Sequence, residues 1–99
     1  MASAPTPWED MLVPVREVKI VNPQGLHMRP AAKFVETVNQ FPCTVTVYKG
    51  DMAVDGRSIM GLIRLEATSG TTLRIEGEGD DAQACLDALA GIVADFDKD

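Results

Sequence analysis

The hydrophobic residues of this 99-residue chain repeat with two different periods, and the order of those periods limits the folds that the chain can adopt. Apolar and polar side chains alternate strictly over residues 43–48, which is typical of a strand with one buried face. Over residues 28–40 the apolar side chains recur every three or four positions, which predicts an amphipathic helix. The same patterns along the whole chain predict strands at residues 15–21, 43–48, 52–54 and 71–78, and helices at 28–40, directly after Ser58, and from about Asp80 or Asp81 onward. Either aspartate is a plausible N-cap for the last of these helices.

This βαββαβα order predicts a two-layer α+β domain. Alternating strands leave one polar face, as in an antiparallel sheet whose other face is covered by helices. The order of the strands within the sheet does not follow from the sequence. Residues 1–14 contain Pro5, Pro7 and Pro14, which interrupt regular structure, so we expect a flexible N-terminal extension ahead of a domain at residues 15–99.

Composition and charge argue against several classes of function. The formal net charge of −6 is opposite to the charge that a nucleic-acid backbone attracts. No apolar run approaches the ~20 residues needed to span a bilayer, and the N-terminus lacks the pattern of a secretory signal, so we expect a cytoplasmic protein. With one histidine and no Cys-x-x-Cys spacing, we expect neither a metal site nor a cofactor. Cys43 and Cys85 are expected to be reduced, partly buried thiols.

The only histidine, His27, lies where the first predicted strand gives way to the first predicted helix. The first N–H groups of a helix attract anions, so those of Met28 and Arg29 are candidate donors to a phosphoryl group. Arg29 adds a permanent charge suited to phosphate oxygens, Pro30 suits the first helical turn, and Gly25 allows a tight turn. The pattern predicts a phosphoryl site with His27 as the carrier and Arg29 as the stabilising cation. Spacing alone leaves an ordinary surface histidine as the alternative.

Three segments carry motifs that occur together, in this order, in a known family. They are residues 18–35 (VKIVNPQGLHMRPAAKFV), residues 56–62 (GRSIMGL) and residues 70–79 (GTTLRIEGEG). The chain resembles the HPr family of histidine-containing phosphocarriers, which belongs to the bacterial phosphoenolpyruvate:sugar phosphotransferase system. The three segments are similar to that family's active-site segment, its regulatory serine region and its last strand, and the resemblance covers about residues 15 to 97. The clearest departure is Met28, where the family often has a smaller residue.

The resemblance implies a four-stranded antiparallel open-faced sandwich and a reversible phosphoryl relay. Phosphorylated enzyme I would donate a phosphoryl group to imidazole Nδ1 of His27, and the phosphohistidine would pass it to the IIA domain of a sugar permease. The protein would be a carrier rather than an enzyme, because it is itself the phosphorylated intermediate. We expect it to be a monomer.

Ser58 is the second candidate site. As the residue before an apolar stretch, it is a natural N-cap for the short middle helix. In many HPr proteins of the low-GC Gram-positive type the matching serine is phosphorylated by a dedicated kinase, so the resemblance offers a regulatory role with a serine kinase/phosphorylase as a possible partner. The sequence leaves open whether Ser58 is a cap alone or a cap and a switch.

Apolar side chains near these two sites are expected to supply a transient docking surface for partners. They are Met28, Ile59, Met60, Leu62 and Ile63. Two other classes of function remain as alternatives. One is a regulatory binding module that partners recognise through Ser58, and the other is a structural interaction domain in which His27 is incidental.

Overall fold

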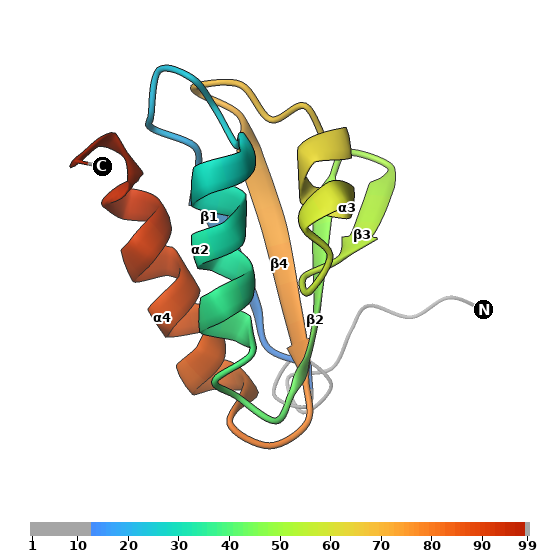
Figure 1. Cartoon of the computed structure of the whole chain (residues 1–99). Helices are drawn as coiled ribbons and strands as arrows, with labels where there is room; N and C mark the ends of the chain where they lie inside the picture. The colour runs from blue at the N-terminus through green and yellow to red at the C-terminus, as the bar shows by residue number, and fades with distance from the viewer. Residues whose placement is uncertain (1–12, 99) are drawn as a thin grey trace.

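Four antiparallel strands form a single sheet in the computed structural model, which describes residues 13–98 (Figure 1). They are β1 (Val15–Lys19), β2 (Thr44–Lys49), β3 (Met52–Asp55) and β4 (Thr72–Glu78). The order across the sheet is β1-β4-β2-β3, so β1 and β3 are its two edges. Most of the expected N-terminal extension, residues 1–12, lies outside the described residues.

Three helices lie on one face of this sheet (Figure 1). They are α2 (Met28–Val38), α3 (Ile59–Arg64) and α4 (Ala82–Ala94), and a short 3₁₀ helix, η1 (Phe96–Lys98), follows α4. The opposite face is left uncovered by the elements of residues 13–98. The predicted α+β open-faced sandwich is therefore confirmed, and so is the predicted order of its elements.

The core forms where the inward side of the sheet meets the helices. Val47 of β2 lies opposite Ile75 of β4, and Val18 of β1 lies opposite Leu73, which is also in β4. Against this sheet the helices place large side chains that are almost fully buried, and removal of this apolar surface from water is the main force that holds the two layers together. These side chains are Phe34, Val38, Leu62, Leu86, Leu89 and Val93.

Some predicted boundaries and one predicted cap differ from the structure. The first helix ends at Val38 rather than at residue 40, and Asn39 follows it as the C-cap. Asp81 does occupy the N-cap position of α4, but its φ is 61° and its side chain makes no capping hydrogen bond. The predicted position is therefore right, while the predicted side-chain cap is wrong because this left-handed backbone differs from the extended backbone that capping side chains require.

Both cysteines are free and buried in the core. Burial, together with the neighbouring Cys43, raises the pKa of Cys85 to about 12. Cys85 therefore stays a neutral thiol at ordinary pH and behaves as a small apolar side chain.

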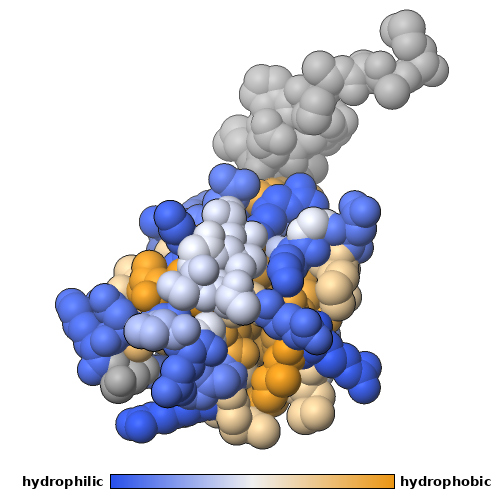
Figure 2. Space-filling model, turned by 90° about the horizontal axis from the view of Figure 1, so that it is seen from above, coloured by the Kyte–Doolittle hydropathy of each residue, from blue (hydrophilic) through white to orange (hydrophobic). Residues whose placement is uncertain are grey.

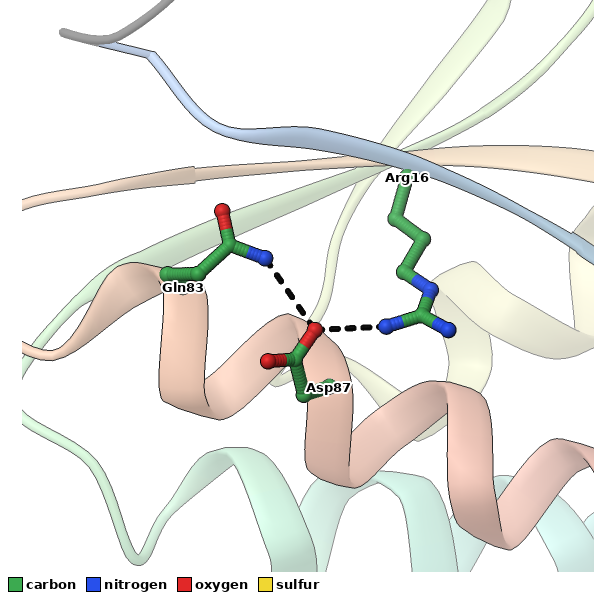
Figure 3. A network of polar contacts seen from close by, with 3 residues as sticks. All are labelled: Arg16, Gln83 and Asp87. Carbon is green, nitrogen blue, oxygen red and sulfur yellow. Dashed lines mark hydrogen bonds and ion pairs between the residues drawn. The ribbon is translucent and has the colours of Figure 1, made fainter.

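A polar network on the surface connects the edge strand β1 to α4 (Figure 3). Asp87 accepts hydrogen bonds from the Arg16 guanidinium and, at 3.1 Å, from Nε2 of Gln83 on the preceding helical turn. The side chains of Arg16 and Asp87 are 46% and 54% exposed, so this ion pair contributes little to stability.

Candidate functional site

The loop between β1 and α2 is attached to the loop that precedes β4. The N–H of Ile20 donates to the carbonyl of Thr71 at 2.9 Å, and the N–H of Gly70 donates to the carbonyl of Ile20 at 2.7 Å. Further along, the N–H of Leu26 donates to the carbonyl of Ala67 at 2.9 Å. These bonds extend the β1–β4 pairing beyond the strands, so the start of α2 is held in a defined place relative to the sheet.

Gly25 is the residue that makes this close approach possible. Its φ is +73°, and a Cβ at this position would lie 2.5 Å from the carbonyl oxygen of Ala67. A side chain there would clash with fixed backbone and would also strain the left-handed conformation. The turn that precedes His27 therefore requires a glycine.

His27 occupies the N-cap position of α2, with an extended backbone at φ −92° and ψ −169°. Its carbonyl accepts the N–H of Ala31 at 3.0 Å, but its side chain makes no capping hydrogen bond. The first N–H groups of a helix have no acceptor within it, and the first turn of α2 contains no acidic residue. An anion beside the His27 ring would therefore meet the N–H groups of Met28 and Arg29 at the positive end of the helix.

A pocket of about 290 Å³ opens beside this helix start. His27 and Arg29 both contribute to its wall, and segments from each end of the domain complete it. The lining residues are Asn22, Pro23, Gln24, His27, Arg29, Pro30, Phe96 and Asp97. His27 and Arg29, the two residues predicted from the sequence, thus line one cavity, and a histidine beside an arginine suits the binding of a phosphoryl group.

Several of these lining residues were not anticipated as parts of the site, among them Asn22, Phe96 and Asp97. Phe96 and Asp97 belong to η1 at the far end of the chain, and no motif around them indicates that they meet the loop before α2. Asp97 is exposed, yet it brings a carboxylate to the pocket that repels an anionic group. Asn22 is buried under the loop, and nothing in its sequence context indicated that.

Ser58 lies at the start of a different helix. It is the N-cap of α3, and its Oγ accepts a hydrogen bond from the N–H of Gly61 at 2.9 Å. The predicted capping role of Ser58 is confirmed. The hydroxyl is half-buried and already engaged in the structure of the helix.

The predicted docking residues divide into exposed and buried ones. Met28 and Met60 are 56% and 59% exposed, and Ile59 and Ile63 are half-buried. Leu62 is fully buried in the core, so the prediction that it contributes to a docking surface is wrong: on a helix, its neighbours in sequence point to other sides. Figure 2 looks down on the end of the molecule where α2 begins and shows hydrophobic surface broken up by hydrophilic side chains.

Comparison with known proteins decides which family this fold and site represent. The family model described as "PTS HPr component phosphorylation site" matches residues 15–95. The chain belongs to the HPr family. As an HPr-family protein it is a phosphocarrier of the phosphotransferase system, which confirms the resemblance read from the sequence.

Individual members of the family support this assignment over most of their length. The chain is 41% identical to the phosphocarrier protein HPr of Pseudomonas putida over 85 residues, which cover 85% of this chain and 94% of that protein. It is 38% identical to the phosphocarrier protein NPr of Shewanella violacea, with 84% of this chain and 92% of that protein covered. The crystal structure of an HPr from Thermoanaerobacter tengcongensis superposes with a TM-score of 0.81 at 33% identity, covering 86% of this chain and 96% of that one.

Residues 13–98 also lack two kinds of feature. Within them, no helix combines the length and the apolar character that a membrane crossing needs. The same residues contain no group of three or more histidine, cysteine, aspartate or glutamate side chains that could hold a metal ion.

Proposed function

We propose that His27 is the phosphoryl carrier of this protein, that phosphorylated enzyme I charges it, and that IIA domains of sugar permeases discharge it. The proposal depends most on one observation. The N-cap side chain of α2, unlike that of α3, makes no hydrogen bond to its own helix and instead lines a pocket together with Arg29. Enzyme I and IIA domains follow from membership of the phosphotransferase family, and such a relay would operate in the cytoplasm with the protein as a monomer.

The transfer itself needs little chemistry from the protein. The lone pair of imidazole Nδ1 of His27 attacks the phosphorus atom, and the bond between phosphorus and the donor breaks as the new P–N bond forms. The transferred group carries negative charge on three oxygens, which the N–H groups of Met28 and Arg29 and the Arg29 guanidinium stabilise. Discharge to the acceptor is the same step in reverse, so the protein is a carrier and not a catalyst.

Docking would use the exposed apolar residues that flank both helix starts. Met28 lies directly beside His27 in the sequence, and Met60 lies in the first turn of α3. Methionine side chains are flexible and polarisable, so they adapt to more than one partner. A small contact of this kind suits an exchange in which each complex must dissociate before the next forms.

Ser58 would regulate this docking. Phosphorylation of its hydroxyl adds about −1.5 to −2 charges at pH 7 beside Ile59 and Met60. That charge would have to be desolvated when a partner covers the apolar surface, so binding of enzyme I would weaken. Exchange of Ser58 for aspartate should therefore raise the KM for this protein as a substrate of enzyme I.

The principal test is direct phosphorylation. Wild-type protein is incubated with phosphoenolpyruvate and enzyme I, and its mass is measured before and after brief acid treatment. We expect one added phosphoryl group that is lost in acid, stable in base and absent in His27→Ala. An unmodified wild-type protein, with enzyme I shown to be active on another HPr, would contradict the proposal, and so would full phosphorylation of His27→Ala.

A further inference from the structure

Asn22 stands out in the loop that leads to His27 because it is buried while the next residues are not. Its side chain is 5% exposed, and Pro23 and Gln24 are both exposed. It is the only buried polar residue among residues 13–98. A polar amide in this position needs an explanation, since burial of a polar group costs free energy unless its hydrogen bonds are restored.

The contacts of Asn22 converge on one residue, Gly25. The main-chain carbonyl of Asn22 accepts the N–H of Gly25 at 3.0 Å, and Nδ2 of its side chain donates to the carbonyl of Gly25. The orientation of the amide follows from this bond, because a carbonyl can only accept and the nitrogen must therefore face it. Asn22 thus holds both polar main-chain groups of Gly25.

The carbonyl group of Gly25 connects the side chain of Asn22 to the main chain of His27. The carbonyl oxygen that accepts from Nδ2 of Asn22 also accepts the main-chain N–H of His27 at 3.0 Å. Rotation of the Gly25 peptide would break both bonds. The position of the His27 backbone, and with it the direction of the imidazole, is therefore coupled to the amide of Asn22.

The other atom of the amide indicates that this arrangement does not serve stability alone. Oδ1 of Asn22 is inaccessible to solvent and has no hydrogen-bond partner among residues 13–98. A buried acceptor left without a donor is destabilising. Leucine has the same branch point at Cγ and carries no polar atom, so it would fill a similar space without that penalty.

We propose that Asn22 is a positioning residue for phosphoryl transfer, which directs the His27 imidazole by holding the carbonyl of Gly25 between its own amide and the His27 N–H. The inference rests on the proposed role of His27 as carrier. Asn22 does not touch the phosphoryl group in this account. It acts through Gly25, and its contribution is to keep the attacking ring nitrogen aligned with the phosphorus atom.

Steady-state transfer from enzyme I provides the first test, with Asn22→Leu and Asn22→Asp as variants. Asn22→Leu removes both amide atoms, and Asn22→Asp keeps the outline while it loses the donor. Because misalignment by a fraction of an ångström to one ångström is costly, we expect the maximal rate to fall about tenfold or more. The KM should stay within about twofold of the wild-type value, since a buried residue cannot contact the partner. Asn39→Leu and Asn39→Asp, at the exposed C-cap of the same helix, are the matched controls and should transfer at the wild-type rate.

Thermal unfolding and NMR separate positioning from a general loss of structure. The melting temperature of Asn22→Leu should equal or exceed that of the wild type, because the unpaired Oδ1 is removed. The imidazole ¹⁵N resonances of His27, which report ring orientation and tautomer without any phosphoryl donor, should shift in both Asn22 variants and stay in place in both Asn39 variants.

The outcomes distinguish this inference from the function on which it rests. Wild-type rates in Asn22→Leu, or unshifted His27 resonances in both Asn22 variants, would overturn the positioning role while leaving His27 as carrier. A fall in rate matched by a fall in melting temperature would also overturn it, because a structural defect would then suffice. If wild-type protein accepts no phosphoryl group, the carrier proposal fails, and the resonance shifts still decide whether Asn22 orients the ring.

Discussion

The helices α2 and α3 begin in opposite ways, although a polar residue precedes each of them. Ser58 caps the start of α3, because its Oγ accepts a hydrogen bond from the N–H of Gly61. His27 leaves the start of α2 open, since its side chain makes no such bond and lines a pocket instead. One helix start is thus used for structure and the other remains free to meet an anion.

The difference follows from how each helix is stabilised along its length. The 11-residue α2 buries Pro30, Ala31, Phe34 and Val38, whereas the 6-residue α3 buries only Leu62. Short helices form poorly without help from their ends, so α3 depends on its cap. A helix that is held by packing can leave its first N–H groups to a ligand.

The C-terminal ends of α2 and α3, unlike their N-terminal ends, are stabilised in the same way. Arg57 donates to the carbonyl of Phe41 at 2.9 Å, just beyond α2, and more weakly to that of Val38 at 3.4 Å. Lys49 donates to the carbonyl of Leu65 at 2.9 Å, just beyond α3. In both cases a cation from another part of the chain donates to carbonyl groups at or just beyond a helix C-terminus.

Among variants that keep His27, reversal of the charge at the open helix start should produce the largest loss in the rate of transfer. Arg29→Glu places a carboxylate where the phosphoryl oxygens gather, so we expect the rate of transfer from enzyme I to fall about 10²-fold. The melting temperature should change little, because Arg29 is exposed. Arg74→Glu makes the same charge change on the uncovered face of the sheet and should transfer nearly normally. Equal rates in the two variants would remove Arg29 from the site.

The turn that leads into α2 can be broken by a single methyl group. Gly25→Ala combines a φ of +73° with a Cβ placed 2.5 Å from the Ala67 carbonyl oxygen. We expect a loss of about 3 kcal/mol in the free energy of unfolding, measured with urea. Gly50→Ala is the matched control, since its φ is +56° but a Cβ would meet nothing within 4 Å, and it should cost about 1 kcal/mol. Similar costs would mean that the loop can move away from Ala67.

Removal of the cations at the helix C-termini should have an intermediate effect. Arg57→Met and Lys49→Met keep most of the aliphatic stem and lose the hydrogen bonds to the carbonyl groups. We expect each to lower the free energy of unfolding by about 1 to 2 kcal/mol. Arg57→Met should also speed amide exchange at residues 38–41, and Lys49→Met at residues 65–66. Unchanged exchange at those residues would show that water replaces the lost donors without cost.

Exchange of the two N-cap side chains for alanine should give small changes in stability, and only one of the two variants should lose acceptance of the phosphoryl group. Ser58→Ala should cost about 1 kcal/mol of stability and leave acceptance of the phosphoryl group intact. His27→Ala should abolish acceptance and change stability by less than about 0.5 kcal/mol, because no capping bond is lost. A His27→Ala protein as destabilised as Ser58→Ala would mean that His27 caps its helix after all.

Much of the difference between the starts of α2 and α3 was predictable, because it depends on residues that are close in sequence. The periodicities over residues 28–40 and 43–48 depend only on which side chains can share a buried face, and they predicted α2 and β2 to within two residues. Ser58 before an apolar stretch predicted a helix start, and the structure confirms its capping bond. His27, Arg29 and Gly25 are close in sequence, so their joint presence predicted a phosphoryl site, and the structure places the first two in the wall of one pocket.

What the sequence by itself determined is the set of elements and the residues that flank the start of α2, since neighbouring side chains and backbone rules specify them. Only the tertiary structure decided the strand order, the burial of Leu62 and the arrival of Phe96 and Asp97 at the pocket. It also revealed that Asn22 holds Gly25 with a buried amide. The first three depend on contacts between segments far apart in the chain, or on which side of a short helix meets the sheet, and local patterns do not encode either. The bond from Asn22 to Gly25 is local, but the burial of the Asn22 amide is a property of the folded chain.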